Sequence, residues 1–171
     1  RMHLDRKNLR VTRLLQKELS GSDTVLDLGC GPSSLLQYVK GPTMTVGVEY
    51  WKPSIEESSQ RGIHTEYINA DITAVKYPDS SFDSVILIDV VEHFTKDGAL
   101  ALIRTIQHWA KKNVIIVVPN GFIPQEEEDE QGNIKQHHLS GWSVKDLNEL
   151  GFRVRGLGGI RYLRGERGQI I

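Results

Sequence analysis

The sequence predicts an α/β protein in which helices cover both faces of a mostly parallel sheet. Segments typical of strands alternate with segments typical of amphipathic helices along the whole chain, which is the pattern of repeated strand–helix–strand units. The most apolar strand, Val-Ile-Leu-Ile at 85–88, contains no polar residue, as expected for a central strand buried on both faces. A glycine-rich turn at 29–31 follows the first expected strand, and parallel sheets bind ligands beyond the carboxyl ends of their strands.

In the first half of the chain, capping and terminating residues separate the expected elements. Ser33 or Ser34 can cap a helix, Gly41 can end it, and Pro53 stands where proline is favoured at a helix start. The expected elements are, in order, a helix over 9–19, a strand over 25–28, a helix with an apolar face of Leu35, Leu36 and Val39, a strand over 44–49, a helix between Pro53 and Gly62, and a strand over about 65–69.

The second half continues the same alternation after the central strand. Ser143 and Asp146 have the spacing of a capping box and predict the start of the last helix, which Gly151 should end. The expected elements are, in order, a helix over 99–110, a strand over 114–118, a helix from Ser143 to Leu150 and a strand over 152–157.

The segment between Asn120 and Trp142 has no periodic signal and is expected to be a long loop. Loops of this length in a compact domain are commonly functional. Its acidic run at 126–130 should repel itself and stay extended. A solvated loop is therefore favoured over a cation-binding one.

The length and composition indicate one globular domain over residues 1–171. No apolar run reaches the roughly 18 residues of a membrane span, and the N-terminus lacks the apolar core of a signal peptide. The single cysteine cannot form an internal disulfide, which fits a reducing compartment. A cytoplasmic protein without a membrane span is therefore expected.

The net charge of −1 conceals an uneven distribution. Residues 1–20 and residues 152–171 each carry a net charge of +4, and the stretch between them carries −9. Basic ends can indicate contact with nucleic acid. No aromatic residue interleaves with the first basic segment, so a solvated helix face and a tail are favoured, and nucleic acid is an unlikely partner.

The strand–turn–helix around Gly29 and Gly31 predicts a ligand site, because glycines let a ligand approach the backbone. Glu49 ends the next strand, where a carboxylate can accept hydrogen bonds from both hydroxyls of a ribose. Asp27 would oppose a pyrophosphate but complements a ligand with an ammonium and a sulfonium group. The third glycine of the dinucleotide-binding fingerprint is also missing, since Ser34 occupies its place.

Four segments at sensible spacing together resemble the class I S-adenosylmethionine-dependent methyltransferases. They include a likeness to the ubiquinone-biosynthesis-like, small-molecule branch of that family, and they lie within residues 20–157. The segments are Val-Leu-Asp-Leu-Gly-Cys-Gly at 25–31, Asn-Ala-Asp-Ile at 69–72, Phe-Asp-Ser-Val at 82–85 followed by Asp-Val-Val-Glu-His at 89–93, and Gly151-Phe152.

The resemblance implies a Rossmann-like three-layer sandwich that binds S-adenosyl-L-methionine at residues following the first four strands. For Asp27, direct contact with the cofactor and a structural role in holding the turn are both open. The implied roles are the backbone of Gly29, Cys30 and Gly31 for the methionine part, Glu49 for the ribose, Tyr50 packed against the adenine, the Asp71 side chain and the Ile72 backbone for the adenine ring, and Asp89 and Val90 at the end of the fourth strand.

Methyl transfer from a sulfonium requires chiefly alignment of the acceptor with the methyl group. A general base is needed only for a hydroxyl, an acidic carbon or a protonated amine. His93 and His138 are the catalytic candidates for that base, although a structural role is an alternative for each. Cys30 is not expected to be a nucleophile. No metal is expected, because Glu92, His137 and His138 lack a tight ligand spacing.

The acceptor expected from the resemblance is a small molecule or a lipid-like molecule. A nucleic-acid or protein methyltransferase and a cofactor-binding module without catalysis are the alternatives, and an NAD-dependent dehydrogenase is more distant. No Asn-Pro-Pro-Tyr segment, which would indicate amino methylation of bases or glutamine, follows the fourth strand.

The C-terminal hairpin typical of the family is expected to be incomplete. Residues 152–157 supply its first strand, but 160–168 contain too many arginines for a buried central strand. The natural chain is therefore expected to continue past Ile171. The alternative is a shortened sheet whose exposed edge pairs with a second subunit in a homodimer.

Overall fold

The computed structural model describes residues 5–124, 137–157 and 169–170. Their contacts divide the chain into two compact units. The first unit comprises Arg1–Ile88 and Leu102–Ile116, and the second comprises Asp89–Ala101 and Val117–Ile171.

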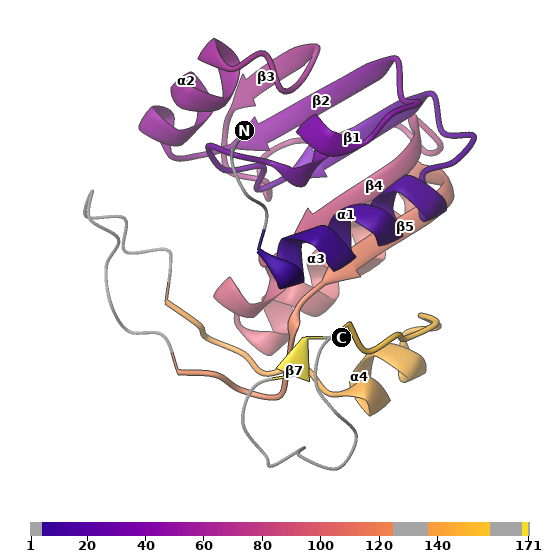
Figure 1. Cartoon of the computed structure of the whole chain (residues 1–171). Helices are drawn as coiled ribbons and strands as arrows, with labels where there is room; N and C mark the ends of the chain where they lie inside the picture. The colour runs from indigo at the N-terminus through magenta and orange to yellow at the C-terminus, as the bar shows by residue number, and fades with distance from the viewer. Residues whose placement is uncertain (1–4, 125–136, 158–168, 171) are drawn as a thin grey trace. The chain divides into compact units, whose positions relative to one another are not determined.

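The first unit is built on a five-stranded sheet with the order β3-β2-β1-β4-β5 (Figure 1). Strand β1 pairs in parallel with both β2 and β4, and β2 pairs in parallel with β3. The chain therefore builds outward from β1 in one direction and then returns to its other side, and ligands in such sheets bind at that reversal. The strands are β1 Thr24–Leu28, β2 Met44–Glu49, β3 Glu66–Asn69, β4 Phe82–Ile88 and β5 Ala110–Val117.

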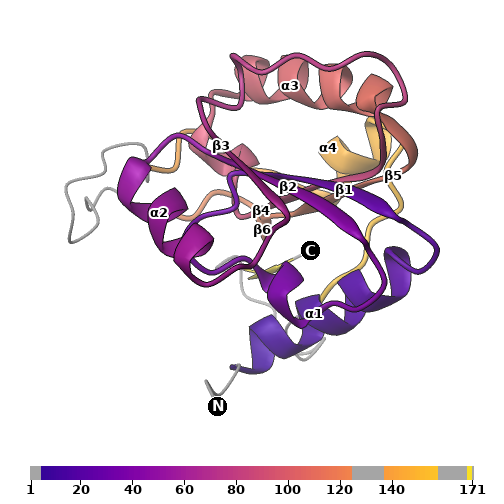
Figure 2. The same cartoon turned by 90° about the horizontal axis from the view of Figure 1, so that it is seen from above.

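Helices lie on both faces of this sheet, as the α/β prediction requires (Figure 2). One face carries α1 Arg6–Glu18, the short η1 Leu35–Tyr38 and α2 Lys52–Gln60, and the part of α3 (Lys96–Trp109) that begins at Leu102 lies on the other. The predicted central strand is buried, with no exposed surface at Val85, Ile86 and Leu87 of β4. In α1 the structure buries Val11, Leu15 and Leu19, whereas Leu9, expected at the start of the apolar face, is 38% exposed.

The predicted helix after the glycine turn is wrong in type and length, because this segment forms a single 3₁₀ turn. Ser34 is its cap, since its side chain accepts a hydrogen bond from Leu36 N. The turn ends where Val39 adopts an extended conformation. The Gln16 side chain of α1 binds both the N–H and the carbonyl of Lys40, at 2.9 and 2.8 Å, and so fixes the chain after one turn.

The second unit contains short elements and the first turns of α3. They are the 3₁₀ turn η2 Val91–His93, β6 Pro119–Asn120, α4 Val144–Glu149 and β7 Gln169–Ile170. The predicted capping box is confirmed: Asp146 N donates to Ser143 Oγ, and Ser143 N donates to the Asp146 carboxylate. The pKa of Asp146 is lowered to about 2, chiefly by that bond from Ser143 N and also by Lys96.

One prediction at the C-terminal end is wrong. Residues 152–157 form no strand, although strand character was expected there. Gln169–Ile170 forms a short strand, β7, that pairs antiparallel with Pro119–Asn120 in a separate two-stranded sheet and does not extend the five-stranded one. A ladder needs a partner for its backbone groups, and β6 offers one to β7. The acidic run at 126–130 and the arginine-rich stretch 160–168 lie outside the described residues.

Across the described ranges, no helix combines the length and apolar character that a membrane crossing requires.

A tight approach inside the first unit yields a stability prediction. Gly47 of β2 faces the ring of His64, and a Cβ at this position would lie 2.5 Å from His64 Cδ2 and 3.0 Å from Cys30 Sγ. Gly47→Ala should therefore lower the free energy of unfolding by about 1–3 kcal/mol, the usual cost of overpacking. Urea denaturation measures this loss. A His64→Ala background removes the closer of these two contacts but leaves that with Cys30, so the loss should shrink there. An equal loss in both backgrounds would contradict the steric explanation.

Candidate cofactor and catalytic sites

The turn after β1 is held against the next strand by its own backbone. Gly29 N and Cys30 N both donate to the carbonyl of Val48, at 2.8 and 3.1 Å. Gly29 and Gly31 have φ angles of 71° and 57°, which side chains disfavour. A Cβ added at Gly31 would meet no heavy atom within 4 Å. The turn therefore leaves open space beside its backbone, as the approach of a ligand requires.

Glu49 places a carboxylate beside this turn. The residue ends β2 and is buried. Its Oε2 accepts a hydrogen bond from Gly31 N at 3.3 Å, and its Oε1 accepts one from Trp51 N at 2.7 Å. Asn69, at the end of β3, donates to the carbonyls of Glu49 and Tyr50. Hydrogen bonds thus link the end of β2 to both the glycine turn and the end of β3, and the Glu49 carboxylate lies at this junction.

Asp27 is buried below the turn and ties it to η1. Its Oδ2 accepts a hydrogen bond from Ser34 Oγ at 2.5 Å and lies 3.5 Å from Nε2 of His64. Burial raises the pKa of Asp27 to about 7 although the Ser34 bond opposes the rise, and the charge of Glu49 adds to it. Burial also lowers the pKa of His64 to about 4, so its imidazole is neutral near pH 7. These contacts support the structural role for Asp27.

Cys30 is buried and faces two carboxylates. Burial raises the pKa of its thiol far above the ordinary value, and the charges of Asp27 and Glu49 raise it further. A protonated, buried thiol is a poor nucleophile. The geometry agrees with the prediction that this position serves through its backbone.

The remaining predicted residues of the first unit follow β2 and β3. Asp71 Oδ1 accepts from Thr73 N and Thr73 Oγ1, at 2.9 and 2.7 Å, which closes the turn after β3. Ile72 is buried, and the ring of Tyr50 lies 6.2 Å from that of Trp51. All eight cofactor-binding residues predicted in this unit thus lie at or next to the carboxyl ends of β1, β2 and β3.

The other predicted residues belong to the second unit. Asp89 has a φ of 52°, a left-handed conformation that costs most residues about 1 kcal/mol or more but suits aspartate better than most. Its N–H donates to the carbonyl of Val117 at 2.8 Å, and Val90 beside it is buried.

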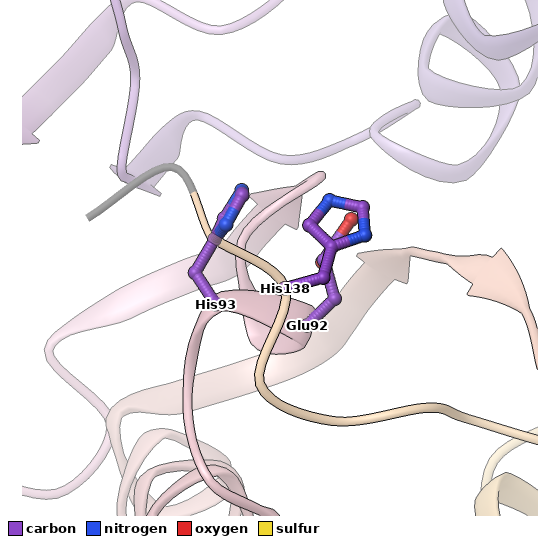
Figure 3. Close-up of side chains that lie close together, drawn as sticks. All are labelled: Glu92, His93 and His138. Carbon is purple, nitrogen blue, oxygen red and sulfur yellow. The ribbon is translucent and has the colours of Figure 1, made fainter. Parts of the chain in front are cut away.

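Glu92, His93 and His138 come together in the second unit, as Figure 3 shows. The histidine ring centroids are 4.9 Å apart, and the three potential ligand atoms lie within 4.8 Å of one another. Leu139 N and Ser140 N both donate to the carbonyl of Glu92, at 2.8 and 3.1 Å. These two bonds bring His138, distant in sequence, to the η2 turn. The sequence suggested His137 in place of His93, and no spacing signal pointed to this group.

The residues of the first unit fit S-adenosylmethionine on structural grounds. The turn is open beside Gly31, and the carboxylate of Glu49 lies next to it. A pyrophosphate would be repelled there, whereas a cationic ligand is attracted.

Comparison with known proteins agrees with this fit. A family model described as a methyltransferase domain matches residues 26–118. The chain is 33% identical over 112 residues to the probable tRNA methyltransferase 9B of Homo sapiens, an alignment that covers 66% of this chain and 22% of that protein. It is 32% identical over 109 residues to the (S)-coclaurine N-methyltransferase of Thalictrum flavum subsp. glaucum, covering 59% of this chain and 29% of that protein. The chain thus spans less than a third of the length of these relatives.

A solved structure shares the fold. The magnesium protoporphyrin IX methyltransferase of Synechocystis PCC 6803 with bound S-adenosylmethionine superposes with a TM-score of 0.62 at 18% identity, covering 96% of this chain and 77% of that one. This likeness shows the fold, and the family model covers more than half of the sequence. The chain therefore belongs to the methyltransferase-domain family, the class I S-adenosylmethionine-dependent methyltransferases.

Proposed function

We propose that this chain binds S-adenosylmethionine at the turn after β1 and catalyses transfer of its methyl group to a small-molecule or lipid-like acceptor. The observation that carries the proposal is the open glycine turn beside the buried carboxylate of Glu49. Both lie at the carboxyl ends of two adjacent parallel strands, where this class of sheet binds its ligands.

The proposed roles are those that the resemblance to the family implies for each residue. The backbone at Gly29, Cys30 and Gly31 holds the methionine part, and the Glu49 carboxylate accepts hydrogen bonds from the ribose. The cofactor supplies a methyl group activated by its sulfonium. The proposed adenine contacts are Tyr50, Asp71 and Ile72, and Asp89 and Val90 are proposed as further contacts.

His93 and His138 are the proposed general bases when the acceptor is a hydroxyl or an acidic carbon. Nδ1 of His93 lies 3.2 Å from the carbonyl of His137, and Nδ1 of His138 lies 2.7 Å from the carbonyl of Ile123. Because a carbonyl only accepts, each Nδ1 carries the proton, which leaves the Nε2 lone pair to accept one. Burial lowers the pKa of His93, a shift that the bond to His137 partly offsets, and so favours the neutral form.

A second candidate acceptor is RNA. The curated relative with 33% identity is named a probable tRNA methyltransferase. Helix α1 also presents a basic surface to solvent, with Arg6, Arg10, Arg13 and Lys17 all exposed, and exposed cations attract phosphates. RNA is thus the alternative to a small-molecule acceptor for the same methyl-transfer reaction.

Transfer of a tritium-labelled methyl group distinguishes these acceptors. The protein is incubated with labelled S-adenosylmethionine and, separately, with a lipid extract, a polar metabolite extract, total tRNA and total protein. Label in either extract supports the proposal, and label in tRNA alone supports the second candidate. Cofactor binding without label in any fraction supports the non-catalytic module. If calorimetry detects no binding of S-adenosylmethionine at millimolar concentration, both the proposed cofactor site and the proposed methyl transfer are contradicted.

Glu49→Ala should weaken S-adenosylmethionine binding by about 1.5–3 kcal/mol, because hydrogen bonds to a charged group are lost. This corresponds to a rise of about 10- to 150-fold in the dissociation constant, measured by calorimetry. Glu56→Ala, which removes an exposed carboxylate of α2 paired with Lys52, is the matched control and should bind normally. An unchanged dissociation constant in Glu49→Ala would refute the ribose assignment.

A further inference from the structure

The group formed by Glu92, His93 and His138 has the composition of a metal site. Two imidazoles and one carboxylate lie with their potential ligand atoms within 4.8 Å of one another. Metal–ligand bonds of about 2.0–2.2 Å place neighbouring ligands about 3–4 Å apart. The observed spacing is somewhat wider than this, so binding a cation would draw the three side chains together, and Figure 3 shows them gathered at one place.

The hydrogen bonds of the two histidines prepare them as ligands. Each Nδ1 faces a backbone carbonyl, that of His137 for His93 and that of Ile123 for His138. Both rings are thereby held in the tautomer whose Nε2 is unprotonated. Metal-binding histidines commonly donate their other N–H to a carbonyl or carboxylate, which fixes the ring and strengthens the ligand.

The backbone around the group is also fixed in advance. The carbonyl of Glu92 accepts hydrogen bonds from Leu139 N and Ser140 N, and Ser140 Oγ donates to the carbonyl of Val91 at 3.3 Å. The η2 turn and the segment 137–140 are therefore joined on both sides of His138. Glu92 itself is only 2% exposed, so its carboxylate lies inside the unit beside the two histidines.

We propose that Glu92, His93 and His138 bind one divalent first-row transition-metal cation. Imidazole nitrogens favour ions such as Zn²⁺ and Co²⁺ over Mg²⁺ and Ca²⁺, which prefer oxygen ligands, and the carboxylate of Glu92 also suits Mn²⁺. Three protein ligands leave at least one coordination position for water or for an oxygen of a bound molecule. A metal bound through Nε2 takes the lone pairs that the proposed general bases need, so the two roles of His93 and His138 exclude each other while an ion is bound. Metal binding is measured without cofactor or acceptor and is therefore tested apart from the proposed methyl transfer.

Calorimetric titration of chelator-treated protein with Zn²⁺, Mn²⁺ or Co²⁺ tests the site, and the absorption of bound Co²⁺ reports the ligand geometry. One ion per chain is expected, with weaker binding of Mg²⁺. His138→Gln and His93→Gln should each weaken binding at least about tenfold and alter the Co²⁺ spectrum. His108→Gln, which removes an exposed histidine of α3, is the matched control and should bind as the unaltered protein does.

Three results would overturn the proposal. They are no binding of any of the three ions at millimolar concentration, unchanged affinity in both histidine variants, and an unchanged Co²⁺ spectrum in Glu92→Gln. Circular dichroism verifies that each variant is folded. Since Glu92 is buried and its variant is the one that can fail to fold, the two histidine variants decide the outcome in that case.

Discussion

Trp142→Ala is expected to lower the free energy of unfolding by about 3–5 kcal/mol, the usual cost of emptying a large aromatic site. Trp142 has no exposed surface and is the largest fully buried side chain of the described residues. Its Nε1 donates to Ser140 Oγ at 3.0 Å, and Lys96 Nζ lies 3.8 Å from the centre of its ring. Alanine removes the packing, the hydrogen bond and the cation–π contact together.

Urea denaturation followed by circular dichroism measures this loss. Trp142→Phe keeps most of the apolar volume but loses the N–H donor, so it should cost clearly less than the alanine variant. Trp51→Ala, at a half-exposed tryptophan of the other unit, is the matched control and should cost less still. A loss below about 1 kcal/mol for Trp142→Ala would contradict the central packing role of this ring.

The second large effect is a pH-dependent gain in the stability of Asp27→Asn relative to the unaltered protein. The folded pKa of Asp27 is about 7 against an ordinary value of 3.8, so between about pH 4 and pH 7 the unfolded chain releases a proton that the folded chain retains. The contribution of Asp27 to stability is therefore present below pH 4 and lost as the pH rises to 7. Asparagine does not ionise. The free energy of unfolding of the variant, relative to the unaltered protein, should rise by about 2–4 kcal/mol from pH 4 to pH 8.

Urea denaturation at several pH values without cofactor checks this result. The neighbouring His64 contributes with the opposite sign, because its lowered pKa of about 4 makes stability rise up to its ordinary value of 6.5. The comparison of Asp27→Asn with the unaltered protein leaves that contribution in both curves. Asp83→Asn provides a control of opposite sign, since hydrogen bonds from Asp23 N and Thr24 N lower the pKa of Asp83 to about 2. If the free energy of unfolding depended on pH in the same way for Asp27→Asn and the unaltered protein, the raised pKa of Asp27 would be contradicted.

The sequence predicted well those elements whose pattern agrees with their burial. Strand β2 spans Met44–Glu49 as expected, because its apolar residues are bounded by a proline on one side and a helix start on the other. The last helix begins at the predicted capping box. In both cases the determining interactions are local, so nearby residues are sufficient to reveal them.

Elements determined by distant partners could not be predicted in the same way. The 3₁₀ turn η1 is short because Gln16, on a different helix, binds the backbone of Lys40. Strand β7 exists through its pairing with β6, some fifty residues earlier. The hydrophobic periodicity within 35–39 or within 169–170 does not reveal these distant partners.

The same distinction applies to the sites. Gly29, Gly31 and Glu49 could be proposed from the sequence, because each is placed by the strand before it. The grouping of Glu92, His93 and His138 could not, since His138 reaches the η2 turn through backbone hydrogen bonds between segments far apart in the chain. The contacts of Asp27 with Ser34 and His64 were equally hidden from the sequence, although Ser34 was one of two candidate caps.

The buried thiol of Cys30 is a probe of local opening in the native protein. It is the single cysteine of the sequence, and alkylating reagents attack only an accessible thiolate. Covalent labelling in the native state can therefore proceed only while the backbone around Gly29 and Gly31 transiently opens. The labelling rate then measures the free energy of that local opening. A molecule that binds to the turn should lower the labelling rate in proportion to its occupancy. Binding can therefore be followed by mass spectrometry before any acceptor is known.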